Sequence, residues 1–132
     1  MTDTAKVYTK FLGTVLTSIS GAEKESERVV LHSTDQDWVI FHEQECCENV
    51  WLEDVVGDLS DLIGNPILIA EKVCSEGKYD RDDDHVTWSY LKLGTIKGVV
   101  TFRWYGSSNG WYSEDVKLRP ENDLHGLYEW KS

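Results

Sequence analysis

The sequence has 132 residues, of which 40% are hydrophobic and 11% are aromatic. This composition predicts one packed domain over residues 1–132, with a core over 11–118 and peripheral ends at 1–10 and 119–132. A chain of this length buries roughly two-thirds of its unfolded surface, so it needs neither disulfides nor a metal to fold. A polar start and the lack of a long apolar run predict no signal peptide and no membrane span, and therefore a cytoplasmic protein.

The charge is strongly acidic and unevenly spread. Thirteen Lys and Arg stand against 24 Asp and Glu, a net charge of −11, and neither Lys nor Arg occurs between Arg28 and Lys72. Such a surface repels phosphate backbones, which argues against direct nucleic-acid binding, and it attracts basic partners. A surface that only keeps the protein soluble is the alternative interpretation, and a cation site is a third.

Apolar alternation and turn residues predict about eight antiparallel strands. The first ten residues are polar and are expected to be frayed or to form a short edge. Turns or loops are expected at 20–27, 34–37, 75–85, 94–98 and 108–110, the last because Asn109-Gly110 is a strong hairpin signal. The predicted strands are 11–19, 28–33, 38–43, 48–56, 66–74, 86–93, 99–105 and 111–118.

The stretch from 48 to 66 admits two interpretations. The first is a strand to Val56, a break at Gly57 and a short helix capped by Asp58 near 58–63, with Asp61 completing an approximate capping box. The second is a single helix over 50–63, because the apolar residues also fit a helical period. Pro66 prevents continuation, and the apolar start of the next strand suggests burial on both of its faces.

The fold class that follows is mainly β, with a minor α content. The expected architecture is a small antiparallel sandwich or a partly open barrel with one short helix near 58–63. Exposed edge strands in so small a domain also allow a homodimer.

The cysteines and one histidine are the first candidate site. Cys46 and Cys47 are adjacent, so on a strand their thiols point to opposite faces, and the spacing is unlike that of zinc sites. His42 and Cys46 are weak candidate metal ligands, and no cofactor is predicted. The neighbouring residues Glu45 and Glu48 disfavour a thiolate nucleophile, so buried structural thiols are the expectation.

The segment RWYGSSNGWYSE is the second candidate site. Alternation places Arg103 and Tyr105 on one face and Trp104 on the other. A cation beside aromatic rings can hold a nucleotide or a phosphate, which predicts a ligand site at Arg103, Tyr105, Asn109 and Tyr112. The alternative is that Arg103 pairs with Glu114 across the hairpin and the aromatic residues form core.

Two motifs carry a resemblance to a known family. CCENVWLEDVVGDLSDLIGNPILIAE (46–71) and TFRWYGSSNGWYSEDV (101–116) resemble a family of small, uncharacterised bacteriophage proteins with the patterns CCExV…GDLxDLxGxP…AE and RWxGxSNGxYSE. The resemblance covers residues 12–118, and Trp111 departs from it by keeping the ring and losing the hydroxyl. It implies a phage accessory protein in the bacterial cytoplasm and implies no activity.

These observations lead to a first functional hypothesis. We expect a non-enzymatic protein that binds and inhibits a basic host protein, such as a defence nuclease or a nucleic-acid-binding factor. An acidic face between Asp35 and Glu71 would steer and contact this partner. The candidate contact residues are Glu45, Glu48, Glu53 and Asp54.

Two alternative functions remain open at the level of sequence. One is a small-ligand binder for a nucleotide or phosphate, built around Arg103. The other is a metal-dependent hydrolase that uses His42 and carboxylates. The sequence contains no P-loop, GxGxxG, GxSxG or HExxH motif, which lowers the odds of the common enzyme classes.

Overall fold

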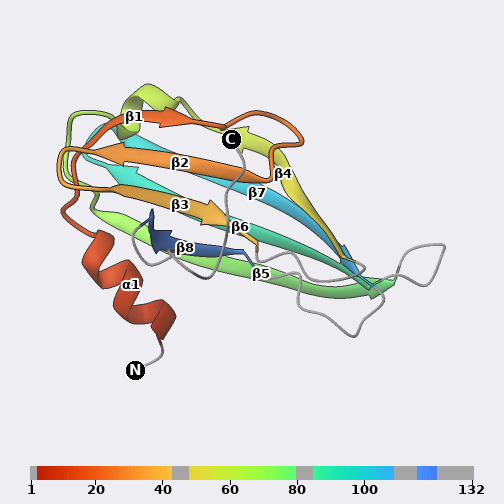
Figure 1. Ribbon diagram of the computed structural model, residues 1–132. Helices are drawn as coiled ribbons and strands as arrows, with labels where there is room; N and C mark the ends of the chain where they lie inside the picture. Colours follow the sequence, from red (N-terminus) through yellow and green to blue (C-terminus); the bar gives the residue numbers. More distant parts are fainter. Residues whose placement is uncertain (1–2, 43–47, 80–84, 109–115, 122–132) are drawn as a thin grey trace.

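The protein folds as two antiparallel sheets with a short helix at one end. The computed structural model describes residues 3–42, 48–79, 85–108 and 116–121 (Figure 1). The elements in chain order are α1 (Asp3–Phe11), β1 (Leu16–Ser20), β2 (Arg28–Ser33), β3 (Asp37–Phe41), β4 (Glu48–Val56), the 3₁₀ helix η1 (Leu59–Leu62), β5 (Ile69–Tyr79), β6 (His85–Thr95), β7 (Gly98–Ser108) and β8 (Lys117–Pro120).

The strands form two layers, as Figure 1 shows. The first sheet has the order β1-β2-β3-β8 and the second has the order β4-β7-β6-β5. All strand pairings within the sheets are antiparallel. The prediction of a mainly β fold with eight strands is therefore confirmed, and the architecture is the sandwich rather than the barrel.

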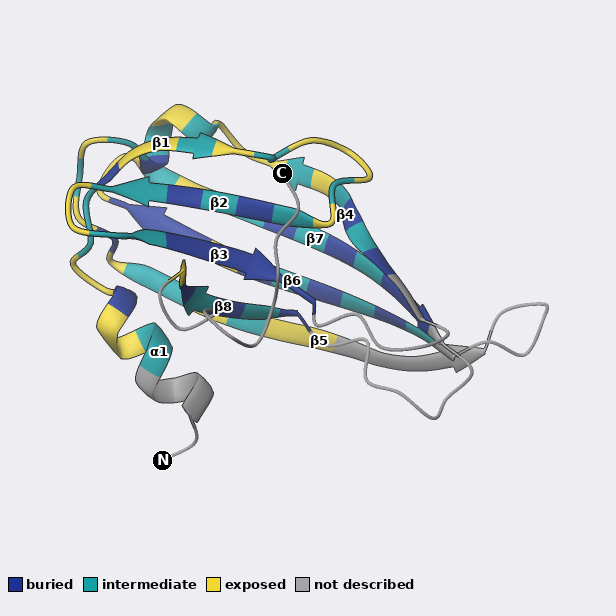
Figure 2. Ribbon diagram, in the orientation of Figure 1, coloured by how far each residue is buried: buried dark blue, intermediate teal, exposed yellow. Residues whose placement is uncertain are grey.

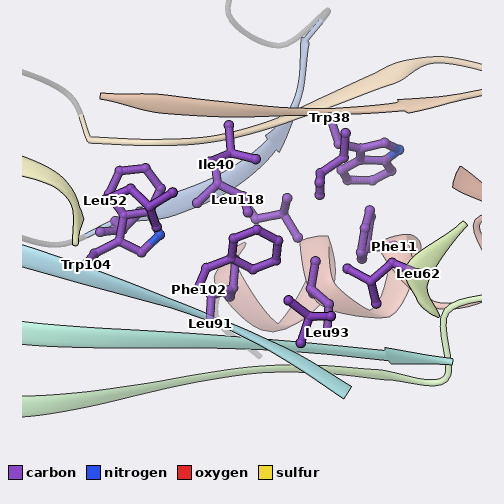
Figure 3. Close-up of a cluster of buried hydrophobic side chains, with 14 of the residues drawn as sticks. Phe11, Trp38, Ile40, Leu52, Leu62, Leu91, Leu93, Phe102, Trp104 and Leu118 are labelled. Atoms are coloured by element: carbon purple, nitrogen blue, oxygen red, sulfur yellow. The ribbon is translucent and has the colours of Figure 1, made fainter. Parts of the chain in front are cut away.

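The core lies between the two sheets. Trp38, Ile40 and Leu118 reach into it from the first sheet (Figure 3). Leu52, Leu91, Leu93, Phe102 and Trp104 reach into it from the second sheet, and Phe11 and Leu62 close one end.

Burial alternates along the strands of the second sheet, most regularly in β7. Phe102 and Trp104 are buried, whereas Arg103 and Tyr105 are half-buried on the outer face (Figure 2). This is the period-2 arrangement of a strand with one face on the core. The predicted separation of Arg103 and Tyr105 from Trp104 is confirmed.

The β2–β3 hairpin is predicted almost to the residue. β2 spans Arg28–Ser33, as expected. β3 begins at Asp37, one residue earlier than predicted, and ends at Phe41, before the predicted end at residue 43. In the turn, the Ser33 hydroxyl donates to the Gln36 carbonyl and accepts from the Gln36 N–H. A short polar turn between two apolar runs is thus enough to specify this hairpin.

The break after β4 also follows the first of the two interpretations, and the single helix over 50–63 is wrong. Gly57 has a φ of +118°, and a Cβ there would lie 2.7 Å from the Val99 carbonyl oxygen. The Asp58 carboxylate caps η1 by accepting from the Ser60 N–H at 3.0 Å. The helix is of the 3₁₀ type, so the cap contacts Ser60 instead of closing a capping box with Asp61.

The N-terminus differs from the prediction. Residues 3–11 form helix α1 instead of a frayed end or edge, and the strand expected from Phe11 begins only at Leu16. Val7, Tyr8 and Phe11 share one side of the helix and pack on the core. Phe11 is fully buried, with its ring centroid 5.0 Å from that of Trp38 in an edge-to-face arrangement.

The C-terminal part differs as well. The expected return strand over 111–118 would pair with β7, but β7 already lies between β4 and β6. The chain instead forms β8, which pairs with β3 in the first sheet. The predicted Asn-Gly turn lies largely outside the described residues.

Several strand boundaries are wrong for a common reason. β5 begins at Ile69 and continues to Tyr79, into the segment predicted as a loop, and the β6–β7 turn is only Ile96-Lys97. The expectation of burial on both faces at the start of the predicted strand 66–74 is also wrong, because Leu68, just before β5, is 59% exposed. Pairing with neighbouring strands extended these elements beyond what local residue type indicates. None of the described helices is long and apolar enough to cross a membrane.

The position of Phe11 generates a stability prediction. Phe11→Ala should lower the free energy of unfolding by about 3–5 kcal/mol, because it leaves a cavity beside Trp38. Leu12→Ala is the matched control, since Leu12 is 44% exposed and its loss should cost less than about 1 kcal/mol. Urea denaturation measures both, and equal effects would contradict the docking of α1.

The cap of η1 generates a pH prediction. Hydrogen bonds from the Ser60 hydroxyl and N–H hold the pKa of the Asp58 carboxyl below its ordinary value of 3.8. This contribution to stability is therefore present above the ordinary pKa and is lost as the pH falls through the lowered one. Asp58→Ala should lower the midpoint of urea denaturation at neutral pH. The difference in midpoint between this variant and the native protein should shrink as the pH is lowered.

Asp58→Asn is the control for this prediction. An Asn side chain can still accept the hydrogen bonds but does not titrate. It should retain most of the neutral-pH stability, with a weaker dependence on acid pH than the native protein. A difference between the native protein and Asp58→Ala that stays constant across the acid range would refute the proposed role of the carboxylate.

Candidate binding face

Aromatic residues cluster on the outer face of the second sheet. The ring centroids of Trp51 and Tyr105 are 4.8 Å apart, and those of Tyr105 and Trp88 are 5.2 Å apart. The guanidinium carbon of Arg103 lies 4.9 Å from the centroid of the Trp88 ring. We call Trp51, Trp88, Arg103 and Tyr105 the aromatic platform.

Strand register creates the aromatic platform. Tyr105 on β7 is opposite Trp51 on β4 and opposite Trp88 on β6, so three rings lie abreast across three strands. Arg103 is likewise flanked by Asp54 and Tyr90. Cross-strand neighbours on one face are close enough for such side chains to touch.

Arg103 has an unusual environment for a charged residue. Its guanidinium stacks on Trp88, and its Nε is buried without a hydrogen-bond partner. A guanidinium held against a ring is a cation–π contact. The N–H groups of a guanidinium point outward in its own plane, so an acceptor has to approach in that plane. The predicted partner Glu114 lies outside the described residues.

A loop from the first sheet crosses the open edge of β4. The Glu25 N–H donates to the Leu52 carbonyl, and the Leu52 N–H donates to the Ser26 carbonyl, both at 2.7 Å. These two bonds hold the β1–β2 loop against the second sheet. They place Glu25 and Glu27 around a hollow of about 470 Å³ that Trp51 also lines.

A β-bulge brings a third carboxylate to the same place. The register between β4 and β7 shifts between Leu52 and Asp54, so Glu53 is an extra residue in β4. Glu53 accepts a hydrogen bond of 3.1 Å from the Trp51 indole N–H, and Lys24 lies 4.0 Å from its other oxygen. We call Glu25, Glu27, Glu53 and Asp54 the acidic rim.

The structure brings together some of the predicted site residues. Glu53 and Asp54 lie in the acidic rim, next to the aromatic platform that contains Arg103 and Tyr105. Only the backbone of Glu48 is described, as part of β4. Glu45, Asn109 and Tyr112 lie outside the described residues.

The acidic stretch between Asp35 and Glu71 does not form one surface. Asp35 lies in the β2–β3 turn, whereas Glu71 lies on β5, at the opposite edge of the second sheet from β4. The carboxylates that do gather come partly from the β1–β2 loop, through Glu25 and Glu27. The acidic rim is therefore a tertiary feature.

The weak metal candidates are not assembled in the described part of the chain. His42 is buried at 6% exposure, and Cys46 lies outside the described residues. Within residues 3–42, 48–79, 85–108 and 116–121, no three His, Cys, Asp or Glu side chains gather to hold a metal ion. Cys74 is an exposed free thiol, 3.8 Å from the Ser89 hydroxyl, so the expectation of buried thiols is wrong for this cysteine, whereas Cys46 and Cys47 lie outside the described residues.

Several residues of this face are not predicted from the sequence. The alternation of the strands places Trp51 and Trp88 on an outward face, but no local signal shows that they contact Tyr105. Glu25 and Glu27 give no signal, because their position depends on the crossing loop. The missing information is the register between segments far apart in the chain.

Comparison with known proteins gives a family but no activity. The chain matches the family described as a domain of unknown function, DUF7448, over residues 9–118. Neither the curated proteins nor the solved structures gave a match. The matched range contains both sheets apart from the end of β8, and with it the aromatic platform and the acidic rim. The chain therefore belongs to the DUF7448 family.

Proposed function

We propose that this protein binds a basic protein partner through the acidic rim and the aromatic platform. The observation that carries this proposal is the hollow between Glu25, Glu27 and Trp51. Neither carboxylate of Glu25 or Glu27 is paired with another described residue. Two open carboxylates beside an indole ring suit a Lys or Arg side chain from a partner.

The chemistry of the hollow favours a cationic side chain. An ammonium or guanidinium group is attracted by the face of an indole ring and forms charge-assisted hydrogen bonds with carboxylates. Trp51 is held in place on one side by Tyr105 and at its N–H by Glu53. The ring therefore needs little reordering when a partner arrives.

The charge of the whole chain supports the same choice of partner. A net charge of −11 attracts basic surfaces over a distance and accelerates encounter with them. The same charge repels nucleic acid. A basic protein is thus the macromolecule that suits both the local hollow and the overall field.

The motif resemblance gives this proposal a biological setting. In a bacteriophage accessory protein, the basic partner would be a host protein, such as a defence nuclease or a nucleic-acid-binding factor. Occupying its basic surface would block access of nucleic acid to that surface and so inhibit it. This setting would place the protein in the bacterial cytoplasm.

A defined basic probe tests the acidic rim. Fluorescein-labelled octaarginine should bind the native protein at low salt, and Glu25→Gln with Glu27→Gln should weaken binding by up to about fivefold per carboxylate, because an exposed ion pair contributes up to about 1 kcal/mol. Fluorescence anisotropy measures the affinity. NMR should show a shift of the Trp51 indole N–H signal on addition of the peptide.

Glu71→Gln with Asp35→Asn is the control, because it removes the same total charge at exposed positions away from the hollow. It should leave most of the affinity intact. Equal losses in the two double variants would mean that binding follows total charge only. That outcome, or no binding by the native protein, would refute the proposal.

A second candidate function is favoured by the environment of Arg103. Its guanidinium forms no ion pair with a described residue and lies against Trp88. This arrangement suits a nucleotide or a phosphate, with the base on an aromatic ring and the anion on the guanidinium. The alternative is therefore a protein that sequesters a small anionic ligand at the aromatic platform.

Removal of the guanidinium tests this alternative. If ATP or inorganic phosphate binds the native protein in calorimetry, Arg103→Ala should abolish the binding. Arg119→Ala is the control, because Arg119 is a half-buried arginine on β8 in the other sheet. Should Arg103→Ala unfold, Arg103→Lys keeps the charge but lacks the planar fork. No binding by the native protein, or equal loss in both arginine variants, would dismiss the ligand.

A further inference from the structure

Three polar side chains form a hydrogen-bonded chain on the outer face of the first sheet. The Ser20 Oγ lies 2.6 Å from the Nε2 of His32, and the Nδ1 of His32 lies 3.1 Å from the Oδ1 of Asp37. The three residues come from β1, β2 and β3. We call them the Ser-His-Asp array.

The strand register places these residues side by side. His32 is directly opposite Asp37 across the β2–β3 hairpin, and opposite Ser18 on β1. Ser20 is two residues further along β1, on the same face as Ser18, so it is a diagonal neighbour of His32. Leu31, between Val30 and His32, points into the core and fixes the face on which His32 stands.

The carboxylate determines how the imidazole is used. An ionised Asp37 can only accept hydrogen bonds, so the Nδ1 of His32 carries the proton in this contact. In the neutral ring, Nε2 is then the acceptor, and the Ser20 hydroxyl donates to it. This is the arrangement in which an imidazole takes a proton from a serine hydroxyl.

We propose that the Ser-His-Asp array is a nucleophilic centre that transfers the acyl group of small carboxylic esters. The Ser20 Oγ bonds to the ester carbonyl carbon while its proton passes to the Nε2 of His32. The tetrahedral intermediate collapses, the bond to the alcohol oxygen breaks, and the leaving alcohol takes the proton from Nε2. Water then attacks the acyl-serine by the same route and releases the acid and free Ser20.

Accessibility defines the class of substrate. Ser20 is exposed, and the side chains of His32 and Asp37 are each 34% exposed, so an ester can reach the hydroxyl from solvent. Because the three side chains stand at the surface of a sheet, we expect small, reactive esters to react more readily than bulky ones. Among the described residues, β1 pairs with β2 along one edge, and its other edge is bridged only at Leu16, by Ile63. Backbone N–H groups further along that edge, towards Ser20, can therefore face a developing oxyanion.

This centre is separate from the proposed binding function. The array lies on the outer face of the first sheet, whereas the aromatic platform lies on the outer face of the second. Asp37 does not touch the substrate in this scheme. It is a positioning residue that selects the tautomer of His32.

A fluorophosphonate probe tests the centre directly, because it forms a bond from a nucleophilic serine oxygen to phosphorus and expels fluoride. We expect stoichiometric labelling of Ser20 in the full chain, located by peptide mass spectrometry. Ser20→Ala should abolish labelling. His32→Gln should slow it by roughly 100-fold or more, since a positioned general base contributes a factor of that order.

Ser18→Ala is the matched control, because Ser18 is also exposed and lies on the same face of β1. It should be labelled at Ser20 as fast as the native protein, and p-nitrophenyl acetate hydrolysis should respond to all the variants in the same order. The role of Asp37 has its own readout. Ring nitrogen NMR shifts should report the Nδ1–H tautomer in the native protein and its loss in Asp37→Ala.

Two outcomes would overturn the proposal. One is a folded native protein in which Ser20 is labelled no faster than Ser18. The other is labelling at Ser20 that proceeds as fast in folded His32→Gln, because the imidazole would then not act as the base. Either would leave the array as a set of cross-strand hydrogen bonds that stabilise the edge of the sheet.

Discussion

The position of β7 at the centre of the second sheet determines the arrangement of the candidate binding face. Both edges of β7 are hydrogen-bonded, to β4 and to β6, so its side chains can only point into the sandwich or away from it. Phe102 and Trp104 point inward and are buried, which leaves Arg103 and Tyr105 outside. A slip of one residue would expose Trp104 and bury the charge of Arg103. The packing of the core therefore determines which residues of β7 lie on the candidate binding face.

The free edge of β4 is the second constraint, because an unpaired strand edge attracts other chains. The β1–β2 loop satisfies both backbone groups of Leu52 and so covers part of that edge. The same contact carries Glu25 and Glu27 to the side of Trp51. Protection of the edge and assembly of the acidic rim are thus achieved by one pair of hydrogen bonds, and the bulge at Glu53 adds a further charge that discourages edge pairing.

The sequence predicts elements specified by neighbouring residues, and fails where distant segments meet. The strand over 28–33 follows from the alternation of apolar residues. The break follows from the presence of a glycine at position 57, which has a positive φ in the structure. Both signals are local. Helix α1 is not predicted, because its sequence is largely polar and the burial of Phe11 depends on a contact with Trp38. In the candidate site, the sequence predicts only the alternation of side chains around Arg103. The row of rings, the acidic rim and the Ser-His-Asp array all depend on how strands and loops far apart in the chain are aligned, and the sequence does not show this alignment.

The residues of the binding face would contribute to binding in different ways. Trp51 is already fixed by Tyr105 and by its hydrogen bond to Glu53, so a partner would not have to immobilise it, a cost of about 0.5–1.5 kcal/mol for a mobile side chain. Glu25 and Glu27 are exposed and must be ordered on contact, which offsets much of their attraction to a cation. The platform would therefore determine how long a complex lasts, whereas the rim would mainly determine how fast it forms, an effect that salt suppresses.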